Sequence, residues 1–131
     1  MDCSPQEEWA TCERLSALGV EIYEHWEEMF DVWAGRLDLC LIPAPIHLHE
    51  PISIAAMEAG ANVLVEKPLA GSLEQVKSIQ SCEEHTGKWV AVGYQDFYKP
   101  SVQAIRRELV DGRIGRIHSK RWIGLWPRGE R

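Results

Sequence analysis

Three consecutive residues, Glu66, Lys67 and Pro68, combine a carboxylate, an ammonium group and a rigid ring directly after a short apolar segment. That segment, Asn62–Val65, has the length and the branched side chains of a buried strand. In open α/β sheets the carboxyl ends of the strands border the ligand crevice. The sequence therefore predicts that both charged groups lie at a ligand site, on a turn that the proline stiffens.

The segment upstream predicts a second strand and a helix. Residues 38–42 form another apolar run, and residues 51–59 place apolar side chains at helical spacing. Pro51 suits the first turn of that helix, and Gly60 suits the position just beyond its end. The expected order is strand, loop, helix and strand, with the charged pair after the second strand.

Two histidines, His47 and His49, lie in the loop expected between the first strand and the helix. An H-x-H spacing on a strand would point both rings to one side and indicate a metal site. This stretch has the pattern of a loop, and no third ligand has a useful spacing. We therefore predict no metal site.

Taken together, these residues resemble the Gfo/Idh/MocA family, which includes glucose–fructose oxidoreductase and inositol dehydrogenase. The resemblance covers nearly the whole chain from Asp2. The matching segments are residues 38–42, Pro45 with His49, and residues 56–60, 63–70, 92–94 and 111–117.

The resemblance implies a nicotinamide-dependent oxidoreductase with Lys67 as its catalytic residue. Lys67 would hydrogen-bond the substrate hydroxyl that loses its proton. Glu66 would contact the nicotinamide ribose, and Lys67, His49 and Pro45 would also lie near the cofactor. The simpler interpretations are a solvated surface lysine at Lys67 and a helix-capping acid at Glu66.

Two further cofactor contacts are implied, one near each end of the predicted domain. Gln95 follows the last predicted strand, where family members contact the nicotinamide amide. Asp2 lies where an acid binds the 2′-hydroxyl of the adenosine ribose, which favours NAD over NADP. Phe97 stands where many members carry arginine, so the substrate contacts near Gln95 are expected to differ.

The sequence departs from the family pattern at both ends. Family members begin with a strand and a G-x-G-x-x-G turn that binds the cofactor pyrophosphate, and none of the ten glycines here has that spacing. Members also carry a second, mainly antiparallel domain. We therefore expect an internal fragment of a longer enzyme. Residues 1–116 would form an incomplete dinucleotide-binding domain, and residues 117–131 would begin the substrate and oligomerisation domain.

The remaining elements are predicted from apolar spacing and from residues that begin and end helices. The strands at residues 39–42, 62–65 and 89–92 are expected to lie parallel and adjacent, in that order. This pattern predicts an α/β fold, a partial Rossmann-type doubly wound parallel sheet that lacks its first strand. Helices are predicted over residues 5–18, 26–33, 72–86 and 101–110, and a further strand over residues 20–23.

Two of these helices carry informative side chains. Ser72 and Gln75 have the spacing of a capping box at the start of their helix. An aromatic stripe runs along the helix over residues 26–33. We interpret this stripe as core packing rather than as a ligand site.

The composition narrows the class of protein. With 131 residues, of which 45% are hydrophobic, the chain can build a core, and its net charge of −6 argues against nucleic acid as the main partner. No apolar run approaches the ~18 residues of a membrane span, and no signal peptide is evident. The four cysteines show no C-x-x-C pairing. We expect a reducing compartment and a cytoplasmic location.

The expected reaction is hydride transfer between NAD or NADP, with NAD favoured, and a hydroxyl-bearing carbon of a sugar, cyclitol or related polyol. The longer parent enzyme is expected to be a homo-oligomer, and this chain alone to be inactive. Two alternatives stay open. One is a non-catalytic binding or regulatory module of the same fold, and the other is a truncated reading frame without function.

Overall fold

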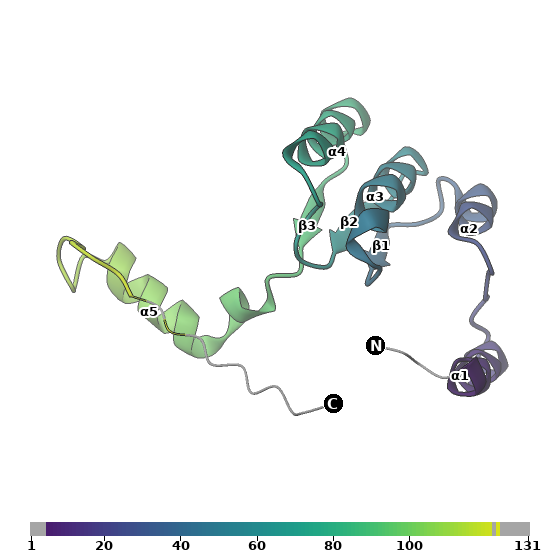
Figure 1. Cartoon of the computed structure of the whole chain (residues 1–131), viewed down its shortest axis with the longest axis horizontal. Helices are drawn as coiled ribbons and strands as arrows, with labels where there is room; N and C mark the ends of the chain where they lie inside the picture. The colour runs from purple at the N-terminus through teal and green to yellow at the C-terminus, as the bar shows by residue number, and fades with distance from the viewer. Residues whose placement is uncertain (1–4, 122, 124–131) are drawn as a thin grey trace. The chain divides into compact units, whose positions relative to one another are not determined.

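The computed structural model describes residues 5–121 and 123, which divide into two compact units, one ending at Gly93 and one beginning at Tyr94. The first unit holds every strand of the described chain (Figure 1). Its elements are α1 (Pro5–Ala17), α2 (Trp26–Trp33), β1 (Leu39–Ile42), the 3-10 helix η1 (Ile46–Leu48), α3 (His49–Glu58), β2 (Asn62–Val65), α4 (Leu73–Thr86) and β3 (Val90–Val92).

The three strands form one parallel sheet in the order β1-β2-β3. Cys40 pairs with Val63, and Val65 pairs with Val92. The ladder continues past the strand ends, because the Glu66 N–H donates to the Ile42 carbonyl at 3.1 Å. The predicted order, direction and adjacency of the strands are confirmed.

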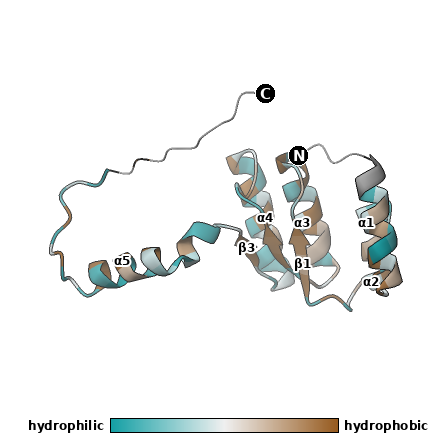
Figure 2. Ribbon diagram, turned by 90° about the horizontal axis from the view of Figure 1, so that it is seen from below, coloured by the Kyte–Doolittle hydropathy of each residue, from teal (hydrophilic) through white to brown (hydrophobic). Residues whose placement is uncertain are grey.

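Within the described residues of the first unit, only one face of the sheet is covered. Side chains of a strand alternate between two faces, and here one set is buried while the other is exposed. Helices α3 and α4 pack side by side along the sheet, as Figure 2 shows. The buried set comprises Cys40, Ile42, Val63 and Val65 of β1 and β2, and the exposed set comprises Leu39, Leu41 and Leu64. This arrangement is a partial Rossmann fold, as predicted.

Helix α3 begins at His49, two residues earlier than predicted. The 3-10 helix η1 runs directly into it, since the Leu48 N–H donates to the Pro45 carbonyl at 2.9 Å. The stretch that carries both histidines is therefore helical rather than a loop. Gly60 follows the helix with a φ of +95°, a left-handed conformation that favours glycine, as predicted.

The predicted capping box at the start of α4 forms in part. Ser72 Oγ accepts a hydrogen bond from the Gln75 N–H at 3.3 Å. The Gln75 side chain turns to a different donor, the Gly71 N–H, at 2.9 Å. Gly87 ends the helix with a φ of +69°. Both ends of α4 therefore follow from the sequence, with a shift of one residue in the reciprocal bond.

The strand predicted over residues 20–23 is wrong, because this segment has no strand beside it among the described residues. Its side chains bond to α2 instead. The Tyr23 hydroxyl donates to the Glu21 carboxylate, and Trp33 Nε1 lies 2.9 Å from the Tyr23 oxygen. Trp33 Nε1 also donates to the Glu21 carboxylate, at 3.1 Å. The bonds from Tyr23 and Trp33 lower the pKa of Glu21, and the bond to Glu21 raises the pKa of Tyr23. The segment is thus held by side chains rather than by a backbone ladder.

The aromatic stripe of α2 packs as predicted. Phe30 is buried in the core, and Trp26 and Met29 pack against it. Trp26 and Phe30 meet edge to face with ring centroids 5.9 Å apart. Helix α2 packs on α3, which places the stripe between the two helices.

The second unit contains a 3-10 helix, η2 (Gln95–Tyr98), and helix α5 (Pro100–Val110). Proline at the first position of α5 starts the helix one residue earlier than predicted, because its missing N–H needs no partner there. Residues 117–121 adopt neither helix nor strand. The domain boundary expected after residue 116 stays a prediction.

No helix of the described residues combines the length and the apolar character that crossing a membrane requires.

Candidate cofactor and catalytic site

The carboxyl ends of the strands bring the predicted site residues of the first unit together. Glu66 continues β2, and Gly93 continues β3, with its N–H donating to the Val65 carbonyl at 2.8 Å. A Cβ built on Gly93 would lie 3.7 Å from Glu66 Oε1. The Glu66 carboxylate therefore borders the point where the chain leaves β3.

Lys67 is exposed at the end of the central strand. Its backbone N–H donates to Glu66 Oε2 at 3.1 Å, and its peptide bond to Pro68 is cis. Among the described residues, no carboxylate forms an ion pair with the Lys67 ammonium group. Its three N–H donors are therefore free to bind a hydroxyl or a phosphate oxygen from a ligand.

His49 lies in a different environment from the one expected for a cofactor contact. Its side chain is only 1% exposed. Nδ1 lies 2.8 Å from the Pro68 carbonyl oxygen, and Nε2 lies 2.8 Å from the Ala44 carbonyl oxygen. Both ring nitrogens are thus engaged with the backbone. His47, by contrast, is exposed.

The other predicted contacts are distributed differently. Pro45 is exposed immediately before η1, in the loop that follows β1. Gln95 is exposed and begins η2, so it belongs to the second unit. Asp2 lies outside the described residues. The structure therefore gathers Pro45, Glu66 and Lys67 on loops at the carboxyl ends of β1 and β2, with His49 buried between those loops.

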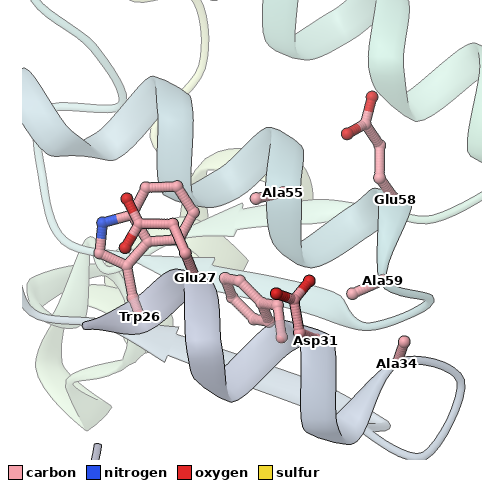
Figure 3. Close-up of a pocket in the computed structure, with 8 residues that line it drawn as sticks. Trp26, Glu27, Asp31, Ala34, Ala55, Glu58 and Ala59 are labelled. Atoms are coloured by element: carbon pink, nitrogen blue, oxygen red, sulfur yellow. The ribbon is translucent and has the colours of Figure 1, made fainter. Parts of the chain in front are cut away.

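A separate pocket of about 310 Å³ lies between α2 and α3 (Figure 3). Carboxylates at its rim would repel the pyrophosphate of a dinucleotide. Its α3 residues belong to the second half of that helix, which leads into the amino end of β2. The pocket is thus removed from Lys67 and is not part of the candidate site. Its lining residues are Trp26, Glu27, Phe30, Asp31, Ala34, Ala55, Glu58 and Ala59.

No group of three His, Cys, Asp or Glu side chains in residues 5–121 and 123 is placed to share a metal ion.

The family of this domain follows from its similarity to known sequences. The sequence model of GFO_IDH_MocA, the oxidoreductase family with an NAD-binding Rossmann fold, matches residues 4–94. The chain belongs to this family. The match ends at the first residue of the second unit, so the sheet and the charged turn both lie within the matched part.

Relatives in the Gfo/Idh/MocA family include several inositol dehydrogenases. Inositol 2-dehydrogenase 1 from Saccharopolyspora erythraea is 33% identical over 98 residues, which cover 74% of this chain and 29% of that protein. The crystal structure of myo-inositol 2-dehydrogenase from Lactobacillus plantarum has a TM-score of 0.71 at 31% identity, covering 88% of this chain and 33% of that one. An inositol dehydrogenase homologue from Azotobacter vinelandii, complexed with NAD+, has a TM-score of 0.71 at 28% identity, covering 79% of this chain and 28% of that one.

The chain spans a third or less of the length of these relatives. The site also has two features that the sequence patterns did not predict, namely the bridge that His49 makes and the position of the Glu66 carboxylate beside Gly93. A glycine directly after a predicted strand was a local signal for the second feature.

Proposed function

We propose that the chain supplies the nicotinamide side of a dinucleotide-dependent oxidoreductase. Lys67 is the proton-transfer residue, and Glu66 contacts the nicotinamide ribose. One observation carries this proposal, which is the exposed Glu66–Lys67 pair at the carboxyl end of the central strand β2. Open α/β sheets bind their ligands at that edge.

Lys67 has the chemistry that this role requires. The cofactor, NAD or NADP with NAD favoured, supplies the hydride acceptor when it is bound. In the oxidation direction the Lys67 amine accepts the proton of the substrate hydroxyl, and in the reverse direction the ammonium group returns it. Because no described carboxylate pairs with Lys67, its donors are available to the substrate.

The substrate class that fits is a sugar, cyclitol or related polyol. The inositol dehydrogenases among the relatives support this choice, since such substrates present a secondary hydroxyl on the carbon that gives up hydride. We also propose a cytoplasmic location, which the absence of C-x-x-C pairing among the four cysteines favours, and a homo-oligomeric enzyme. The dinucleotide-binding domain would extend to residue 116, with the substrate domain following.

Cofactor titration tests the proposal on the chain itself. The sequence has no G-x-G-x-x-G turn to bind the pyrophosphate, so we expect NADH to bind weakly and in fast exchange. Amide chemical shifts in a 15N-labelled sample should move at Glu66, Lys67 and Gly93. The Lys67→Ala variant should bind NADH about as well, because the lysine acts on the substrate.

Three outcomes would contradict this expectation. Chemical-shift changes confined to α2 and α3 would place the ligand in the pocket between these two helices instead. No shift at high NADH concentration would favour a non-catalytic module of the same fold. Micromolar affinity in calorimetry would show that the missing glycine-rich turn is dispensable for binding.

A further inference from the structure

His49 joins two loops that are far apart in the sequence. It is the first residue of α3, and its ring is buried between the Ala44 and Pro68 carbonyl oxygens, 2.8 Å from each. A buried polar side chain needs hydrogen-bond partners, and both partners here are backbone acceptors. One belongs to the loop after β1, and the other to the turn after β2.

The ring must act as a donor in this setting, because a carbonyl oxygen only accepts. A neutral imidazole donates through one ring nitrogen, and an imidazolium donates through both. In either form at least one of the two loops is tied to the ring.

The Pro68 contact matters because the Lys67 turn, whose Leu69 and Ala70 pack against the core, has few other hydrogen bonds. The Glu66 N–H bonds to Ile42 on one side of the turn, and the Gly71 N–H bonds to Gln75 on the other. Between them, the Lys67 N–H donates only to its neighbour, the Glu66 carboxylate. Among the described hydrogen bonds, the one to His49 is the only one that ties residues 67–70 to another element.

We propose that His49 is a positioning residue that fixes the Lys67 turn against the loop after β1. It acts through the Pro68 carbonyl, one residue beyond Lys67, and thereby sets where the lysine ammonium group stands. The importance of this position for catalysis rests on the proposed function of Lys67. The hydrogen-bonded bridge between the two loops does not depend on that function.

Two variants separate the two halves of the bridge in the full 131-residue chain. In His49→Asn the amide nitrogen falls near the position of Nδ1 and can still donate to Pro68. In His49→Gln the amide nitrogen falls near Nε2 and can still donate to Ala44. The readout is the backbone 15N order parameter of Lys67, with His47→Gln as the exposed control.

The bridge predicts opposite patterns in the two variants. The Lys67 order parameter should stay at about 0.85 in His49→Asn, which keeps a donor to Pro68, and fall below about 0.6 in His49→Gln, which does not. His47→Gln should leave the Lys67 order parameter unchanged. Equal loss of order in both His49 variants, or no loss in either, would overturn the proposal, because a merely space-filling ring would behave in one of these ways.

The unmodified chain gives an independent test should either variant fail to fold. At least one His49 ring N–H proton should exchange slowly enough to be observed, whereas the His47 ring protons should be lost to solvent. Fast exchange at both histidines would overturn the bridge. Neither test involves cofactor or turnover, so an intact bridge beside an inactive Lys67 would refute the proposed function alone.

Discussion

Lys67 stands exposed at the end of the central strand, and its proposed role makes a kinetic prediction. Residues 4–94 of this chain would replace the matching segment of the Lactobacillus plantarum enzyme. In that chimera Lys67→Ala should reduce kcat roughly 10²–10⁴-fold, since a positioned acid–base group contributes about that much. The dissociation constant for NADH should change little. Steady-state kinetics with myo-inositol and fluorescence titration of NADH measure the two quantities.

The matched control for this experiment is Lys77→Ala. Lys77 is an exposed lysine on α4, outside the candidate site. The Lys77→Ala substitution removes the same charge as Lys67→Ala and should leave kcat unchanged. Turnover of the Lys67→Ala chimera within a few-fold of the unmodified chimera would remove Lys67 from the mechanism.

Individual residues also show how far a sequence reveals a site. Glu66 and Lys67 were predicted correctly to lie at a strand end, because the strand and its terminus are both local patterns. The surroundings of His49 were not predictable in this way. Its partners are set by the packing of α3 and not by neighbours in the chain, since Pro68 lies 19 residues away. An H-x-H pattern carries no signal for such a contact.

At the scale of an element, α4 offers a direct test of its cap. Ser72→Ala removes the side-chain acceptor of the Gln75 N–H and should lower the free energy of unfolding by about 1 kcal/mol. Ser81→Ala, an exposed substitution within the same helix, serves as control. Urea denaturation followed by circular dichroism measures both. An equal effect of the two substitutions would show that the cap contributes nothing.

The elements also explain where prediction from sequence succeeds and fails. Strands β1 and β2 were predicted because their apolar runs are flanked by clear breaks. The segment over residues 20–23 has similar local alternation, yet a strand exists only where a neighbour supplies the hydrogen bonds. Here Glu21 and Tyr23 bond to Trp33 instead. Alternation alone could not reveal that the neighbour was missing from the described chain.

At the scale of the whole molecule, the uncovered face of the sheet predicts self-association. Leu41 is 63% exposed on β1, whose outer edge is unpaired among the described residues. Open strand edges and contiguous apolar patches pair with other chains. We expect the 131-residue chain to dimerise or aggregate as its concentration rises. Sedimentation velocity over a range of concentrations measures this.

A charge on the edge strand should suppress the association. Leu41→Lys places an ammonium group on the exposed face of β1 and should shift the population towards monomer. Leu73→Lys introduces the same charge at a leucine that is 74% exposed at the start of α4, away from the sheet. It should leave association unchanged. A monodisperse monomer of the unmodified chain at every concentration would show that the exposed face does not mediate self-association.

The order of the strands has a consequence for how the protein is made. Along the sheet, β1, β2 and β3 follow one another as they do along the chain. Each strand leaves the ribosome after the strand that it joins, and each pairing closes a single helical connection. No strand has to wait for a distant, later segment. The strand–helix–strand repeats that carry Glu66 and Lys67 can therefore assemble during translation, before the rest of the chain has been synthesised.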